Sequence, residues 1–294
     1  MNMKESMEEV INIIKKSLSQ KSFPIVSLSV IGKHSKSLSV RNYTLIEDLD
    51  LLLILEKVSP EFLNFVKTLS DDIRKYIFQK SKITVCYEMK GGPVKIYRKE
   101  PTILLHWLIF DISHYKKLSP LLHNSINKSH RLLMGISPKK ICKVNGITIG
   151  DVLYVPEGIL FYKEMVKKGV VINSLWRRKK DTLQLEICKK KVKDQKFFVD
   201  ICCSAVLKSY KNLYEASRKV EKLRKELSSK TLLKEIETFK SIKMKLRNGE
   251  ELSKKEIIQT RKKALKVLEM LEKIGIMLES LENDKKEHRE KYYI

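Results

Sequence analysis

The pattern of apolar and polar residues predicts a helix and two strands within the first 55 residues. Apolar side chains recur every three or four positions from Met3 to Ser19, which is typical of an amphipathic helix. The run 25–32 is apolar, rich in β-branched residues and ends at a glycine, as expected for a buried strand that enters a tight turn. After the acidic stretch 47–50, five consecutive aliphatic residues predict a second buried strand.

Further helical and β-type segments follow up to residue 136. Ser59 before a proline predicts a helix N-terminus, and one apolar helical face continues from there to about Lys80. Two β-rich runs flank a Gly-Gly-Pro turn and predict a hairpin, a longer apolar run predicts another strand, and a helix leads into a short aliphatic strand that ends at a glycine. These segments are residues 83–89 and 94–98, then 103–111, then 119–135.

The sequence changes in character after residue 136. An Asn-Gly pair at 145–146 predicts a small hairpin or short β element over 141–155, and 157–168 is predicted to be helical. From residue 197 onward Pro and Gly are almost absent and the apolar spacing is helical, with helices predicted over 200–227, over 232–246 and from a capping box at Ser253. We therefore predict an α+β fold with a mixed β-sheet and flanking helices in 1–136, a connecting α/β segment in 137–196 and a helical bundle in 197–294.

Composition adds a strong and uneven positive charge. The formal net charge is +25, and residues 131–294 carry 40 Lys and Arg against 22 Asp and Glu, which gives this part a net +18. Such an excess attracts polyanions, although a lysine-rich surface without that role has the same composition. The five cysteines lack paired metal spacing, which favours buried thiols in the reducing cytoplasm, and neither a membrane span nor a secretory signal is expected.

The acidic stretch before the second strand is the candidate for chemistry. Asp48 and Asp50 are two positions apart, so on a strand they point to the same face. Two carboxylates this close repel each other unless a cation lies between them. Mg²⁺ or Mn²⁺ suits that arrangement, because Mg²⁺ takes carboxylate oxygens and keeps positions open for phosphate oxygens.

A strand, a glycine turn and an Asp-Leu-Asp strand resemble the core of the nucleotidyltransferase superfamily, which includes DNA polymerase beta and the minimal nucleotidyltransferases. The resemblance covers about the first 135 residues. It implies that Gly32, Lys33, Ser35 and Ser37 contact the triphosphate of a nucleotide. In the family a serine follows the glycine and a second glycine comes soon after, whereas this chain has Lys33 and Ser37 at those places.

The resemblance also implies a third carboxylate on a neighbouring strand, which completes the metal site and helps to deprotonate the attacking hydroxyl. Two residues compete for this role, Glu88 and Asp111, with a narrow preference for Asp111 as a carboxylate at the end of a long buried strand. His106 is expected to be a structural histidine. Lys90, Lys95 and Arg98 are near enough in sequence to contact phosphates, although an exposed edge strand also carries such residues.

A dense basic run lies in the connecting segment. It begins beside an aromatic residue and consists of Trp176, Arg177, Arg178, Lys179 and Lys180. Such a run can bind a nucleic-acid backbone while the indole stacks on a base. It is equally typical of an exposed loop.

Three functions follow from these patterns. The first is a metal-dependent nucleotidyltransferase that moves NMP from a nucleoside triphosphate onto a hydroxyl of RNA, such as tRNA. The second is a catalytically degenerate protein of the same fold that binds RNA or acts as an antitoxin or scaffold. The third is a nucleotidyltransferase that modifies a small molecule such as an antibiotic. A homodimer through the C-terminal helices is a further possible assembly, because their apolar stripe also suits a coiled coil.

Overall fold

The computed structural model of this chain describes residues 1–38, 40, 45–91, 100–118, 120–143, 149–179, 182–217 and 221–280. The fold is α+β, with a five-stranded mixed sheet and a helical C-terminal region, so the predicted fold class is confirmed. The chain forms two compact units. The first comprises Met1–Leu118, Leu122–Val144 and Asn173–Cys188, and the second comprises Ser119–Leu121, Asn145–Ile172 and Lys189–Ile294. The three-part division at residues 136 and 196 stays a prediction.

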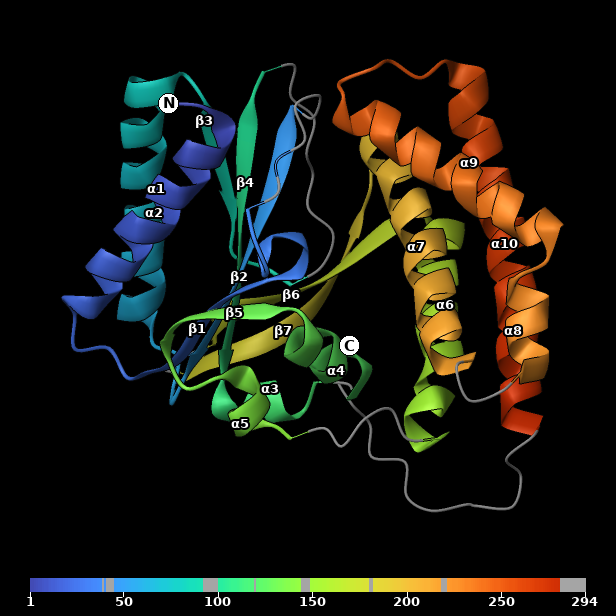
Figure 1. The fold of residues 1–294 in the computed structure, drawn as a ribbon, viewed down its shortest axis with the longest axis horizontal. Coiled ribbons are helices and arrows are strands. Elements are labelled where there is room, and N and C mark those ends of the chain that lie inside the picture. The colour runs from blue at the N-terminus through green and yellow to red at the C-terminus, as the bar shows by residue number, and fades with distance from the viewer. Residues whose placement is uncertain are drawn as a thin grey trace. The chain divides into compact units, whose positions relative to one another are not determined.

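The sheet of the first unit has the strand order β3-β4-β2-β1-β5 (Figure 1). Strand β1 is antiparallel to both of its neighbours, whereas β4 is parallel to β2 and to β3. The central position of β2 and β4 explains their continuous apolar sequences, because both of their faces are covered. The strands are β1 (Ile25–Ile31), β2 (Ile46–Leu55), β3 (Thr84–Glu88), β4 (Thr102–Asp111) and β5 (His130–Gly135).

Helices α1 (Met3–Ser19) and α2 (Pro60–Ser81) cover one face of this sheet (Figure 1). Helix α1 begins with a capping box, in which Asn2 and Glu5 each accept a hydrogen bond from the other's backbone N–H. The N-terminus of α2 is capped by Ser59, as the sequence predicts. Their apolar faces pack on alternate residues of the central strands, which are Leu49, Leu51, Leu53 and Leu55 of β2 and Ile103, Leu105, Trp107 and Ile109 of β4.

The opposite face of the sheet is covered by a smaller apolar cluster. Helices α3 (Ile112–Lys116) and α4 (Pro120–Lys128) contribute Tyr115 and Ile126, and β2 contributes Leu52 and Ile54. Helix α5 (Pro138–Ile141) follows β5, and Ile141 packs against the same cluster. On β2 this cluster begins only at Leu52. The two positions that precede Leu52 on the same face, Asp48 and Asp50, lie outside the apolar cluster.

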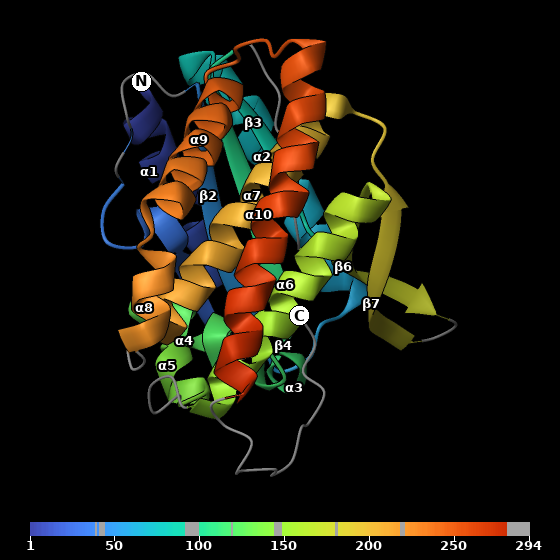
Figure 2. The same ribbon diagram turned by 90° about the vertical axis from the view of Figure 1, so that its right-hand side faces the viewer.

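The second unit is helical, and Figure 2 gives the clearest view of its helices. Helices α6, α7 and α10 pack against one another, and α9 packs against α7. The predicted capping box is present, because Ser253 and Glu256 exchange hydrogen bonds at 2.8 and 3.2 Å before α10. The helices are α6 (Ile149–Lys168), α7 (Gln195–Ala216), α8 (Glu221–Leu227), α9 (Lys230–Arg247) and α10 (Lys254–Ser280).

Two sequence-based predictions for this region are wrong. The span 200–227 is not one helix but α7 and α8, with Ser217 as the C-cap of α7. The β element over 141–155 is not present at 149–155, because α6 already begins at Ile149, whereas the Asn145-Gly146 pair lies outside the described residues. The helix predicted over 157–168 therefore begins further toward the N-terminus, at Ile149, than the Asn-Gly turn signal suggested.

Strands β6 (Val170–Lys179) and β7 (Thr182–Lys191) form a separate two-stranded sheet. The hairpin partner predicted over 94–98, with Lys95, Arg98 and the Gly92-Pro93 turn, lies outside the described residues. None of the described helices is both long enough and apolar enough for a membrane span. All five cysteines are free thiols, and burial raises the pKa of Cys202 to about 12, so this thiol stays protonated at neutral pH.

Candidate functional site

Asp48 and Asp50 lie at the start of β2 and point to the same face of the sheet. Their neighbours Leu49 and Leu51 belong to the core under α1 and α2, whereas Leu52 belongs to the cluster on the opposite face. Alternation along the strand therefore directs both aspartates to the face of Leu52. The Asp50 side chain keeps 33% of its surface exposed. The spacing argument thus holds, and the two carboxylates are neighbours on an incompletely covered part of the sheet.

The glycine turn lies directly against this pair. Ile31, the last residue of β1, pairs with Asp50, and Gly32 follows with φ of +74°. A Cβ atom on Gly32 would lie 3.1 Å from Oδ2 of Asp50. Only glycine combines that backbone conformation with so close an approach. The turn therefore brings backbone atoms up to one oxygen of the Asp50 carboxylate.

Glu47 anchors the residues that follow the glycine. Its carboxylate accepts a hydrogen bond from Lys33 Nζ at 2.6 Å and lies 3.1 Å from Nε2 of His34. The Glu47 side chain is 1% exposed and, being one position from Asp48, belongs to the opposite face of the strand. The Lys33 ammonium is consequently held on the side away from the aspartate pair. The predicted phosphate contact by Lys33 would require this ion pair to break.

The two predicted serines differ in their environments. Ser35 is buried, and its hydroxyl donates to the Gly32 carbonyl at 2.8 Å and lies 3.1 Å from the hydroxyl of Ser129. It therefore stabilises the turn from within. Ser37 is exposed at the end of the same segment.

His106 occupies the position on β4 that faces Asp50. The parallel register pairs Asp48 with Leu104 and Asp50 with His106, so β4 brings no carboxylate to the aspartates. His106 Nδ1 lies 3.0 Å from Oδ1 of Asp50, and Nε2 lies 2.7 Å from the carbonyl oxygen of Lys90. Burial alone would lower the pKa of His106, but the hydrogen bond and charge of Asp50, together with the Lys90 carbonyl and Asp48, raise it above the ordinary value of 6.5. The ring is therefore held as a donor between two strands.

Glu88 lies in the same row of the sheet, one strand further from the pair. Its position on β3 is opposite His106, so Glu88, His106 and Asp50 face the same side. The Glu88 carboxylate is 3.4 Å from the ammonium of Lys90 and is partly exposed. Strands are about 4.8 Å apart, which puts Glu88 on the order of 10 Å from Asp50 at the backbone.

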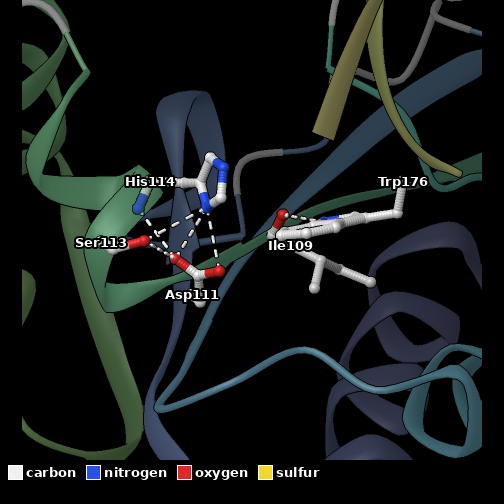
Figure 3. A network of polar contacts seen from close by, with 5 residues as sticks. All are labelled: Ile109, Asp111, Ser113, His114 and Trp176. Carbon is white, nitrogen blue, oxygen red and sulfur yellow. Dashed lines mark hydrogen bonds and ion pairs between the residues drawn. The ribbon is translucent and has the colours of Figure 1, made fainter. Parts of the chain in front are cut away.

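The register does not bring Asp111 to the aspartates, contrary to the preference expressed above. Asp111 pairs with Leu55, five positions beyond Asp50, and Leu55 belongs to the opposite face of the sheet. Its carboxylate instead caps α3 (Figure 3), accepting from the backbone N–H of His114 at 2.8 Å and from the Ser113 hydroxyl at 2.7 Å. Burial favours a higher pKa for this carboxyl, but these donors hold its pKa below the ordinary 3.8.

Trp176 is engaged in packing on β6. Its ring N–H donates to the carbonyl of Ile109 at 3.0 Å, and its ring meets that of His114 edge-on with centroids 5.1 Å apart (Figure 3). The indole is therefore committed to the end of β4, and stacking on a base would require it to leave these contacts. Sequence alone could not show this, because the partners lie about 65 residues away.

The basic residues after Trp176 are exposed. Arg177 lies 3.7 Å from Glu186 of β7 in an exposed ion pair, and Arg178 and Lys179 follow on β6. Backbone and Ser59 hydrogen bonds lower the pKa of Glu61 at the start of α2, and the charge of Arg178 contributes. Lys180 lies outside the described residues.

The described residues fit a cation that is shared with a nucleotide. No three His, Cys, Asp or Glu side chains in the described part of the chain are grouped so that they could hold a metal ion by themselves. Mg²⁺ at phosphate-transfer sites is bound through one or two carboxylates plus substrate phosphates. Asp48 and Asp50 are the two carboxylates that would serve in this way, and Gly32 lies directly against Oδ2 of Asp50.

Two residues of this region were not predicted from the sequence to belong to the site. The role of Glu47 could have been predicted from the sequence. Glu47 directly precedes Asp48 on a strand, so its side chain points to the opposite, apolar face, where a buried carboxylate needs a partner. The role of His106 could not, because its pairing with Asp50 depends on β4 lying beside β2, which no short-range pattern reveals.

No protein-family model matches this sequence, and no curated protein matches it. Among solved structures, the chain is similar to the crystal structure of spectinomycin adenyltransferase AAD(9) from Enterococcus faecialis with ATP and spectinomycin. The TM-score is 0.48 with 12% sequence identity, over 91% of this chain and 100% of that chain. At these values the likeness establishes neither family nor function.

Proposed function

We propose that this protein transfers a nucleotidyl group from a nucleoside triphosphate to a hydroxyl acceptor, with Mg²⁺ or Mn²⁺ held by Asp48 and Asp50. One observation carries the proposal. Two carboxylates share a face at the start of β2, and the glycine turn after β1 lies directly against one of them. A Cβ atom on Gly32 would lie only 3.1 Å from Oδ2 of Asp50. A triphosphate at that turn would lie beside both carboxylates.

The chemistry is an in-line displacement at the α-phosphorus. A divalent cation bound by the pair supplies counter-charge for the phosphate oxygens. The acceptor hydroxyl oxygen forms a bond to the α-phosphorus, the bond to the bridging oxygen breaks, and pyrophosphate leaves with that electron pair. The hydroxyl proton passes to a carboxylate. Glu88 is the candidate for this base, since it is partly exposed and faces the same side as the pair.

RNA, such as tRNA, is the proposed acceptor. The net charge of +18 over residues 131–294 favours a polyanionic partner. Arg177, Arg178 and Lys179 are exposed on β6 and are suited to phosphate contacts rather than base readout. Trp176 is left out of the proposed RNA contact because its ring is packed.

A catalytically degenerate, RNA-binding protein of this fold is the second candidate. It is favoured by the residues opposite the aspartates on β4, which are Leu104 and His106 instead of a carboxylate. The ion pair of Lys33 with buried Glu47 also favours this candidate, because the Lys33 ammonium is then not free to contact a phosphate at the glycine turn. In that case the chain retains RNA but transfers nothing.

Transfer of label from α-³²P nucleoside triphosphates tests the proposal. The protein is incubated with Mg²⁺, each triphosphate in turn, and either total RNA or a panel of hydroxyl-bearing aminoglycosides. We expect labelled RNA with the wild type and none with Asp48→Asn or Asp50→Asn. Asp72→Asn is the matched control, since Asp72 is exposed on α2, which covers the opposite face.

The outcomes separate the candidates. Labelled aminoglycoside without labelled RNA would assign a small-molecule acceptor. Salt-sensitive RNA retention without any label would support the degenerate binder and contradict the enzyme. Equal labelling by wild type and both aspartate variants would show that another site is responsible.

A further inference from the structure

We propose that His106 is a positioning residue that orients the carboxylate of Asp50, directing one oxygen toward the glycine turn. This inference rests on the function proposed above, because it concerns how Asp50 would meet a cation carried with a nucleotide. His106 itself touches neither the reacting atoms nor the cation in this proposal. Its effect passes entirely through Asp50.

The contacts of the ring fix its orientation at both ends. Nδ1 lies 3.0 Å from Oδ1 of Asp50 on the neighbouring strand, and Nε2 lies 2.7 Å from the carbonyl oxygen of Lys90, just after β3. The His106 side chain is only 12% exposed. The carbonyl oxygen of Lys90 and the carboxylate oxygen of Asp50 can only accept, so both ring nitrogens donate, which requires the doubly protonated imidazolium. Nε2 ties the ring to the backbone at the end of β3.

The two oxygens of Asp50 consequently have different roles. Oδ1 receives the hydrogen bond from His106, whereas Oδ2 is the atom 3.1 Å from the position of a Cβ on Gly32. A carboxylate without such a donor rotates about its Cβ–Cγ bond, and both oxygens then visit both directions. With His106 in place, Oδ2 is the oxygen offered at the turn.

The place of His106 in the sheet makes this role specific. It is the residue of β4 directly opposite Asp50, at the position where a third carboxylate would have to lie to face the pair. A histidine there donates to Asp50 instead of repelling it. Hydrogen-bond partners of metal-binding side chains typically change metal affinity by about 10- to 100-fold when removed.

Three substitutions separate the two contacts of the ring. In His106→Asn the amide nitrogen is as many bonds from Cα as Nδ1, so the contact with Asp50 can be kept while that with Lys90 is lost. In His106→Gln the amide nitrogen corresponds to Nε2, which keeps the Lys90 contact and loses Asp50. His106→Leu removes both. His114→Leu is the control, because His114 also contacts an aspartate, Asp111, but at the other end of β4.

Binding of Mn²⁺ is measured from the EPR signal of the free ion, with and without α,β-methylene-ATP. We expect the wild type, His106→Asn and His114→Leu to bind alike within a few-fold. We expect His106→Gln and His106→Leu to bind about 10- to 100-fold more weakly. Denaturant unfolding gives the loss of stability of each variant. If His106 had a purely structural role, the loss of Mn²⁺ affinity would follow the loss of stability across the variants.

The results distinguish this inference from the proposed function. If the folded wild type binds no Mn²⁺ in either condition, both are overturned. If the wild type binds and His106→Leu binds equally well, only the positioning role is overturned. Should His106→Leu fail to fold, the comparison of asparagine with glutamine still decides, because equal affinities for these two variants would also refute the role.

Discussion

Replacement of Gly32 by alanine should lower both the stability of the first unit and the Mn²⁺ affinity of its candidate site. The backbone at Gly32 has φ of +74°, a conformation that costs an L-residue about 1–2 kcal/mol. The new methyl group would also lie 3.1 Å from Oδ2 of Asp50, so that oxygen must move by a few tenths of an ångström. We therefore expect the free energy of unfolding to fall by about 1–2 kcal/mol, and the displaced carboxylate to bind Mn²⁺ less tightly.

Gly169 provides a matched control for the backbone effect. It also has positive φ, +61°, but nothing lies within 4 Å of the position of its Cβ. Gly169→Ala should therefore cost a similar 1–2 kcal/mol without any change in metal binding. The difference between the two variants in Mn²⁺ affinity isolates the contact with Asp50.

The assay can follow the first unit selectively. Both tryptophans of the chain, Trp107 and Trp176, belong to that unit, so fluorescence during urea unfolding reports Gly32→Ala. Gly169 lies in the second unit, for which far-UV circular dichroism of the helices is the suitable signal. If Gly32→Ala binds Mn²⁺ as tightly as the wild type while losing stability, the reasoning that places the cation beside the turn is refuted.

Three further outcomes are expected. Glu47→Gln should lower the unfolding free energy by about 1–3 kcal/mol, since it removes the buried carboxylate that binds Lys33 at 2.6 Å; unchanged urea midpoints would contradict this. The lowered pKa of Asp111 contributes stability that is present above pH 3.8 and is lost as pH falls through the folded-state value, so the wild type should lose stability more steeply below pH 4 than Asp111→Asn, and parallel acid curves would argue against that cap. Replacing the three basic residues of 177–179 by alanine should reduce the slope of log K for RNA against log salt by up to about 2, and an unchanged slope would exclude them from the RNA contact.

Local patterns predicted most elements because each rests on near neighbours in sequence. The helix from Met3 and the capping box at Ser253 follow from side chains within one turn, and the structure has both. The break between α7 and α8 was missed because apolar spacing continues across it. The Asn145-Gly146 turn signal was outweighed at 149–155 by the helical sequence of α6.

The part of the site that depends on strand order and register could not be predicted from the sequence. Asp48 and Asp50 needed only the alternation of one strand to be placed on a common face. Asp111 needed the register of β4 against β2, which puts it opposite Leu55 and on the other face. The same register brings His106 to Asp50, and it is set by long-range packing that no motif in the chain encodes.

A crystal of the protein soaked with Mn²⁺ and α,β-methylene-ATP would test the central claim most directly. Anomalous scattering at the manganese edge locates the ion independently of the model of the protein. We predict a peak about 2.1 Å from carboxylate oxygens of both Asp48 and Asp50, with the phosphates beside Gly32. A well-ordered nucleotide bound elsewhere, with no anomalous peak at these two carboxylates, would contradict the account.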